Sequence, residues 1–180
     1  EYNIDRIGNL YLETLKNKLD FKNYFSLNSN VKNYSINYIS PYGTSGYAIA
    51  GKEYLKSLKN KSYLKWTPLY FEEFYTVKED SDLVNLINVK LDSEVNIIHS
   101  TPEWWPDRIE KNKLNIGYTV WETDKIHPSW KDYLNLVDAV MVTSKWNKKV
   151  FLDSGVYKPI YVIPHIAPDI EKKKKKTYDV

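Results

Sequence analysis

Two polar side chains stand directly after apolar runs that are typical of buried strands. His99 ends the run EVNIIH, and Glu122 follows the apolar run 116–121. Ligands of open α/β sheets bind at the carboxyl ends of the strands, so we expect both side chains to point into one ligand crevice. There the Glu122 carboxylate could accept a hydrogen bond from a substrate hydroxyl or act as a base, with Thr123 beside it as a binding residue.

Both candidates also have a structural interpretation. A histidine at the end of a strand can tie two loops together, and a carboxylate can cap the helix that is expected to begin near Pro128. Asp124 suits that cap better by its spacing, which leaves Glu122 free for chemistry. The two remaining histidines are expected elsewhere, His127 exposed near the start of that helix and His165 after the last strand.

A glycine-bearing loop follows the first predicted strand of the α/β pattern. The strand covers residues 35–40, the loop reads PYGTSG, and a helix with its apolar stripe between Ala48 and Leu58 comes at once. Unpaired backbone N–H groups and the positive end of the helix dipole would make this loop an anion-binding site. The alternative is an ordinary turn that uses glycine for its conformational freedom, since neither GxGxxG nor the GK[ST] ending of a P-loop is present. The candidate binding residues are Gly43, Thr44, Ser45, Gly46 and Tyr47.

Two adjacent tryptophans, Trp104 and Trp105, stand between Pro102 and Pro106. Indole faces can stack on the C–H faces of sugars, and Trp104 is therefore a candidate substrate-binding residue. They can equally fill the end of a sheet with apolar surface, which is the simpler interpretation.

The elements that would position these residues alternate between strand and helix periods. Strands are predicted at residues 35–40, 64–71, 94–99, 116–121, 139–142 and 160–163, with Pro68 favouring an edge or a bulge in the second. Helices are predicted at 6–19, after the glycine loop, after Pro128, and between the cap residue Ser144 and Gly155. This pattern predicts an α/β, three-layer, Rossmann-like domain with a mainly parallel sheet and an extra N-terminal helix.

The second half of the chain resembles a known family. The segments GYTVWETDKIHPSW, LVDAVMVTSKWNKKVFLDSGV and IYVIPHIAPD follow one another in the order and spacing of the N-terminal domain of GT-B glycosyltransferases similar to glycosyltransferase family 4. The resemblance covers about residues 35–169. Ile166 and Ala167 depart from it, because the family usually has a glycine soon after the position of His165.

The resemblance implies a glycosyltransferase that moves a sugar from a nucleotide-sugar donor to a sugar acceptor, with retention of stereochemistry. It implies that the loop at 43–46 faces the donor phosphates and the acceptor, and that His99 contacts the transferred sugar or the donor. The family's C-terminal Rossmann-like domain, which grips the donor nucleotide, has no counterpart in these 180 residues. We therefore expect the isolated chain to be inactive. The expected organisation is an N-terminal helix and connector (1–33), the Rossmann-like acceptor-side domain (34–169) and a lysine-rich linker or tail (170–180).

Composition excludes several other classes of protein. The chain has no cysteine and only three scattered histidines, so neither a metal site nor a cofactor is expected, and Asp80-Ser81-Asp82 is interpreted as a polar surface turn. Five of the positive charges lie together at 172–176, so the rest of the chain is not basic and nucleic acid is not an expected partner. Neither a membrane span nor a signal peptide is found, and a reducing, cytoplasmic location is expected.

Two other functions stay open at this point. One is a non-catalytic carbohydrate- or partner-binding module of the same fold within a larger protein. The other is a flavodoxin-like or Rossmann-type nucleotide binder, which the absence of a dinucleotide fingerprint disfavours.

Overall fold

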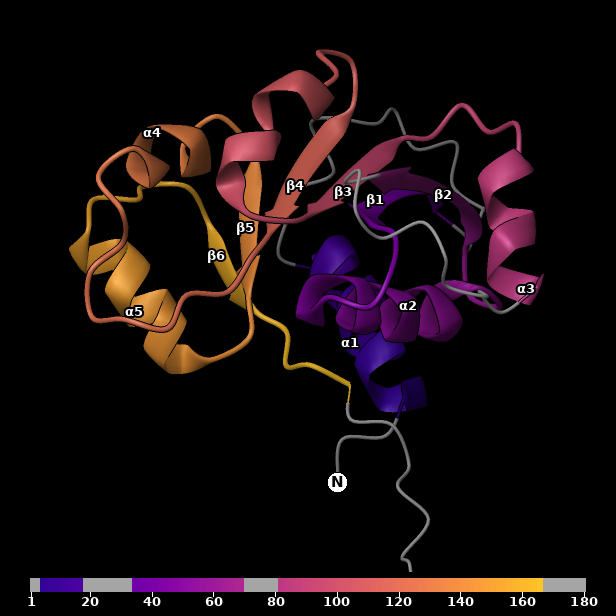
Figure 1. The fold of residues 1–180 in the computed structure, drawn as a ribbon, viewed down its shortest axis with the longest axis horizontal. Coiled ribbons are helices and arrows are strands. Elements are labelled where there is room, and N and C mark those ends of the chain that lie inside the picture. The colour runs from indigo at the N-terminus through magenta and orange to yellow at the C-terminus, as the bar shows by residue number, and fades with distance from the viewer. Residues whose placement is uncertain (1–3, 18–33, 70–80, 167–180) are drawn as a thin grey trace, which may run out of the picture.

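A sheet of six parallel strands runs through the part of the chain that the computed structural model describes, residues 4–17, 34–69 and 81–166 (Figure 1). The strand order is β2-β1-β3-β4-β5-β6, and every neighbouring pair is parallel. The strands are β1 (Ser35–Pro41), β2 (Tyr63–Leu69), β3 (Val95–His99), β4 (Leu114–Tyr118), β5 (Ala139–Val142) and β6 (Ile160–Val162). The predicted α/β fold with a parallel sheet is confirmed.

Helices lie between the strands. The longer ones are α1 (Ile4–Asn17), α2 (Gly46–Leu58), α4 (Trp130–Leu134) and α5 (Lys145–Asp153). The short ones are α3 (Ser81–Val84), η2 (Asn85–Asn88), η3 (Pro102–Trp104) and η4 (Pro106–Arg108). In Figure 1, α1 and α2 lie together beside β1, whereas α4 and α5 lie at the end of the sheet formed by β5 and β6.

Each face of the sheet has its own apolar core, because successive side chains of a strand point to opposite faces. One core joins Ile36, Ile97 and Ile116 of the strands to Tyr54, Leu55 and Leu58 of α2 and to Ile7 of α1. The other joins Ile39, Ile98 and Val140 to Trp130 and Leu134 of α4 and to Val150 and Phe151 of α5. Full burial of an aliphatic or aromatic side chain contributes roughly 1.5–3 kcal/mol, so both faces stabilise the sheet.

Serine caps begin α2 and α5, and a glycine ends α5. The Ser45 hydroxyl accepts the Ala48 N–H at 3.2 Å, and the Ser144 hydroxyl accepts the Asn147 N–H at 3.0 Å. Gly155 has a φ of +88°, a left-handed conformation that glycine adopts without a steric cost. The predicted cap at Ser144 and helix end at Gly155 are thus confirmed.

The N-terminal helix predicted over residues 6–19 is found as α1, and it packs closely on α2. A Cβ at Gly8 would stand 2.8 Å from the Ser57 carbonyl oxygen, so only glycine lets the two helices approach this closely. Leu19, the predicted connector up to residue 33 and the lysine-rich segment 170–180 lie outside the described residues.

Several predicted boundaries were wrong. The strand predicted to reach Trp121 ends at Tyr118, because its neighbour β3 ends at His99, the register partner of Tyr118. The helix predicted from Pro128 begins at Trp130. Ile49, within the predicted apolar stripe between Ala48 and Leu58, is half exposed. Pro68 lies in β2, which among the strands described here pairs with β1 alone and is thus at the edge, as predicted.

Candidate functional site

The candidate site lies where the strand order reverses. From β1 the chain passes through α2 to β2 on one side, and it then returns to β3 on the other side of β1. Ligands of doubly wound sheets bind outside the carboxyl ends of the strands at such a switch point. The loop 43–46 follows β1, and His99 is the last residue of β3. The structure therefore brings together two of the three predicted groups, and β4, the strand before Glu122, is the next neighbour.

Gly43 shapes the loop after β1. Its φ is +119°, and its carbonyl oxygen accepts a hydrogen bond from Lys52 Nζ at 2.9 Å. Because Lys52 belongs to α2, this bond ties the loop to the helix that follows it. Thr44, Ser45 and Gly46 are exposed, and a Cβ at Gly46 would meet no atom within 4 Å. The start of α2 is thus exposed to solvent, as an anion-binding helix start requires, although Ser45 already accepts the Ala48 N–H.

His99 is completely buried beside α2. Its Nδ1 lies 2.8 Å from the Tyr38 hydroxyl, and its ring stacks on Tyr118 at 4.4 Å with an angle of 17°. Its Nε2 is the one buried side-chain polar atom of the described residues that has no hydrogen-bond partner. Burial lowers the pKa of His99 to about 3, and the nearby His165 lowers it further in the same direction. The ring is therefore neutral at physiological pH.

Two tyrosine hydroxyls beside His99 hold the chain after β6. Tyr118 donates to the Ile163 carbonyl oxygen and Tyr54 to the Pro164 carbonyl oxygen, both at 2.7 Å, and the two hydroxyls contact each other. Burial raises the pKa of Tyr54. The His165 ring then lies 6.5 Å from His99. The strand-end histidine is thus enclosed by the middle of the sheet, by α2 and by the segment that leaves β6.

Tyr47 connects the start of α2 with the residues after β4. Its hydroxyl lies 2.8 Å from Thr119 Oγ1 and accepts the Val120 N–H at 3.3 Å, while its ring lies 5.4 Å from that of His99. Burial raises the pKa of Tyr47, and the charges of Glu103 and Glu122 raise it further. Hydrogen bonds with Thr119 and Val120 offset part of this rise, and both carboxylates are exposed.

Glu122 was predicted to follow its strand directly. The structure places it four residues beyond the end of β4. It is exposed, in a bend that the Trp121 indole and the Thr123 hydroxyl stabilise by donating to the Lys125 carbonyl oxygen at 2.6 and 2.9 Å. Asp124 was predicted to cap the following helix, but it is exposed and lies away from the helix start. The N-cap residue of α4 is Ser129, whose side chain makes no capping hydrogen bond. Glu122 therefore lies on the rim of the site, in contact with solvent.

The two adjacent tryptophans have different environments. Trp105 is fully buried, donates to the Ser100 carbonyl oxygen at 3.3 Å and lies flat against Gly117. Trp104 is 46% exposed. The apolar filling of the sheet end is thus Trp105, and Trp104 lies at the surface. Trp146, in the first turn of α5, is 47% exposed and was not singled out from the sequence.

Three tyrosines that surround His99 were also missed. Tyr38 and Tyr118 occupy strand positions that pattern analysis assigns to the core, and Tyr54 belongs to the apolar stripe of α2. The register of the sheet could have indicated one of them, because β3 and β4 are parallel neighbours that end together, so that Tyr118 pairs with His99.

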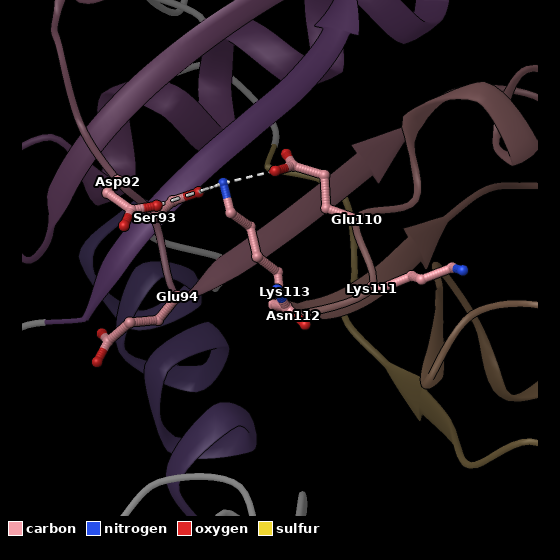
Figure 2. A pocket seen from close by; sticks show the side chains of 7 residues that line it. All are labelled: Asp92, Ser93, Glu94, Glu110, Lys111, Asn112 and Lys113. Atoms are coloured by element: carbon pink, nitrogen blue, oxygen red, sulfur yellow. Dashed lines mark hydrogen bonds and ion pairs between the residues drawn. The ribbon is translucent and has the colours of Figure 1, made fainter.

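A second polar region lies at the opposite, amino ends of β3 and β4. A pocket of about 560 Å³ lies there. Its lining side chains are drawn in Figure 2, in which Lys113 points between Asp92, Ser93 and Glu110. Lys113 Nζ lies 2.8 Å from Glu110 Oε2 and 3.8 Å from Asp92 Oδ1, and this bonding holds the pKa of Glu110 below its ordinary value. Behind the pocket, Asn96 Nδ2 donates to Glu110 Oε1 at 3.0 Å. Lys113 is thus already paired with carboxylates of the protein, so this pocket is a weaker candidate than the His99 region.

No group of three potential metal ligands occurs within residues 4–17, 34–69 and 81–166. Asp82 is exposed, as predicted, and bonds to Lys59 at 2.7 Å, but it lies in helix α3 and not in a turn, while Asp80 lies outside the described residues. In the same part of the chain, no helix has the length and apolar character that crossing a membrane requires. Comparison with protein-family models, curated proteins and solved structures found no match.

Proposed function

We propose that the chain is the acceptor-side, N-terminal domain of a GT-B glycosyltransferase similar to glycosyltransferase family 4. In this proposal the protein moves a sugar from a nucleotide-sugar to a glycan, lipid or protein acceptor, and a C-terminal Rossmann-like domain holds the donor nucleotide. Because the chain contains no cysteine, we place this activity in a reducing compartment, the cytoplasm.

The observation that carries the proposal is the position of an unpartnered polar atom. The buried Nε2 of His99 lies at the carboxyl end of β3, by the β1/β3 switch point and beside α2, the helix that follows the glycine loop. Buried polar atoms without a partner are rare, and a ligand is one of the few explanations for them. The resemblance of segments 117–130, 136–156 and 160–169 to the glycosyltransferase domain assigns a sugar or a phosphate to that ligand.

Glu122 has a distinct role in this proposal. Its carboxylate is solvated and lies on the rim near Tyr47, so it suits an incoming hydroxyl of the acceptor better than the donor. A hydrogen bond from that hydroxyl to a carboxylate would orient the nucleophilic oxygen. Trp104, exposed after β3, supplies a flat apolar surface near the same rim.

A matched pair of variants tests the role of Glu122. In the protein that joins this domain to its donor domain, Glu122→Gln should lower kcat/KM for the acceptor by at least about tenfold, because a charge-assisted hydrogen bond contributes roughly 1.5–3 kcal/mol. Asp124→Asn, an equally exposed carboxylate two residues away, should leave it unchanged. Equal effects of the two substitutions would contradict the assignment.

Donor binding to the isolated chain tests the domain assignment. Calorimetry with UDP- and GDP-sugars should give weak binding, because the nucleotide is held by the other domain. Nanomolar binding would show that the nucleotide site lies in this chain and would overturn the proposal.

A carbohydrate-binding module without catalysis is the second candidate. The observation that favours it is the exposure of Trp104 and Trp146, 46% and 47%, after strands β3 and β5 of the same sheet edge. Maltotetraose and chitotetraose serve as probes. Binding that is lost in both Trp104→Ala and Trp146→Ala, with no transfer activity in the protein that carries the donor domain, would favour the module over the enzyme.

A further inference from the structure

We infer that Tyr38 is a positioning residue that holds His99 as the tautomer with its hydrogen on Nε2, so that the ring offers a hydrogen-bond donor to an oxygen atom of the ligand. The inference deepens the proposed function, on which it rests for the identity of the ligand. The tautomer itself follows from contacts within the described residues.

The orientation of the His99 ring is fixed from several sides. Tyr118 lies flat against one face at 4.4 Å, and the rings of Tyr47 and Tyr54 approach edge-on at 5.4 and 5.8 Å. At Gly51 of α2, even a Cβ would come within 3.7 Å of Nδ1. The close approach of α2 and the stacked Tyr118 ring leave the imidazole little freedom to rotate, so the two nitrogens keep distinct surroundings.

The Tyr38 hydroxyl meets Nδ1 at 2.8 Å, and only one of the two atoms can supply the hydrogen. A phenol is a stronger acid than a neutral imidazole N–H, and a bare imidazole nitrogen is a stronger base than a phenol oxygen. The bond is therefore stronger when Tyr38 donates to Nδ1. The hydrogen bond made by one ring nitrogen determines which nitrogen carries the proton, so the proton of His99 lies on Nε2.

The position of the hydrogen on Nε2 determines which kind of ligand atom can bind to His99. Nε2–H has no acceptor among the described residues, and a donor in this position pairs with an oxygen lone pair. The ionisable groups whose rings face His99 are Tyr38, Tyr47, Tyr54, Tyr118 and His165, and none of them supplies a carboxylate that would stabilise a charged imidazolium. His99 thus acts as a neutral donor and not as a general base.

The route to Nε2 follows from the exposure of the surrounding rings. Tyr38, Tyr54 and Tyr118 are completely buried, whereas Tyr47 is partly exposed and His165 is exposed. A ligand oxygen therefore approaches between the start of α2 and the segment after β6. The shared chemistry is an oxygen acceptor, which a sugar hydroxyl or a phosphate can supply.

Nitrogen-15 NMR of the histidine side chains tests the tautomer directly. The chain has only three histidines, so the variants His127→Gln and His165→Gln assign the three rings. We expect His99 to carry its hydrogen on Nε2 at neutral pH, without titration between about pH 5 and 8. A hydrogen on Nδ1 in the wild-type chain, or a charged ring, would overturn the inference regardless of any activity.

Two tyrosine variants separate the hydroxyl from the ring. Tyr38→Phe should change the tautomer ratio of His99 by about tenfold toward Nδ1–H, the effect of one neutral hydrogen bond. Tyr54→Phe keeps a ring at 5.8 Å but has no bond to His99, and the ratio should stay unchanged. An unchanged ratio in Tyr38→Phe, or equal changes in both variants, would contradict the role of Tyr38. If Tyr38→Phe does not fold, the wild-type spectrum alone decides.

Two ligands, each added at saturation to the protein that joins this domain to its donor domain, distinguish the source of the oxygen atom. A shift of the Nε2–H signal with both UDP and UDP-glucose identifies a phosphate oxygen, and a shift with UDP-glucose alone identifies a sugar hydroxyl. Either result supports the inference. A shift of the Gly43 amide without any change at Nε2 would overturn the ligand contact but not the proposed function. If neither signal moves, the proposed function fails, whereas the tautomer is still judged from the wild-type spectrum.

Discussion

A single methyl group at Gly117 tests the packing of Trp105 beneath the candidate site. Gly117 lies in β4, and a Cβ there would stand 2.2 Å from Cη2 and Cζ3 of the Trp105 indole and 2.7 Å from Cε3. Carbon atoms in contact normally lie about 3.5–4.0 Å apart, so in Gly117→Ala the ring has to move by more than about 1 Å. It has little room to do so, because the indole is completely buried.

The expected loss of stability lies between two known limits. Overpacking of a core that yields costs about 1–3 kcal/mol, and complete loss of a buried tryptophan costs about 3–5 kcal/mol. A central strand holds the glycine on one side of the contact, so we expect about 3 kcal/mol. For a chain of this length this corresponds to a decrease in Tm of about 6–12 °C.

Thermal and urea unfolding of Gly117→Ala measure this loss, with Gly46→Ala as the matched control. A Cβ at Gly46 meets no atom within 4 Å, so the control should change stability by less than about 0.5 kcal/mol. In a Trp105→Leu background, where the ring is absent, Gly117→Ala should cost much less than in the wild type. If Gly117→Ala melts within about 1 °C of Gly46→Ala, the close contact between β4 and the indole is refuted.

Two further predictions concern the same end of the sheet. Trp105→Ala should lose about 3–5 kcal/mol of unfolding free energy, whereas Trp104→Ala, which removes a side chain that is 46% exposed, should lose less than about 1 kcal/mol. Chemical denaturation of both variants checks this, and equal losses would contradict the different environments of the two indoles. The pKa of His99 is about 3 in the folded chain and 6.5 in a free side chain, so between these pH values the unfolded state binds one more proton than the folded state. The free energy of unfolding should therefore fall as the pH falls, by up to about 1.4 kcal/mol per pH unit. In urea titrations at pH 7 and pH 5, His99→Gln should show a smaller decrease than the wild type, and an equal decrease would be evidence against a buried neutral ring.

Local patterns of the sequence were sufficient to predict the fold. The alternation of strand and helix periods predicted the parallel sheet, and Pro68 marked the edge strand because proline cannot donate to a second neighbour. Ser144 and Gly155 marked the ends of α5 by their own chemistry. Each of these signals acts within a few residues and does not depend on the rest of the chain.

The details of the site depend on contacts between distant residues, which no local pattern contains. Glu122 was placed at the end of its strand because the apolar run continues to Trp121, but the length of β4 is limited by the neighbour β3. The assignment of Trp105 rather than Trp104 to the core depends on the bare backbone of Gly117. The tyrosines around His99 looked like ordinary core residues, and only their assembly shows that one nitrogen has no partner.

The hydroxyls of Tyr54 and Tyr118 form a mechanical tether for the backbone that leaves β6. A pull on the chain beyond Ile166 acts on the buried Ile166 side chain and then on the carbonyl groups of Ile163 and Pro164, which these phenols hold at 2.7 Å. Such a pull either breaks these hydrogen bonds or displaces the Tyr118 side chain. The His99 ring is stacked on the Tyr118 ring and would move with it. Tension in the departing chain is therefore transmitted to the histidine nitrogen without any direct contact between the two.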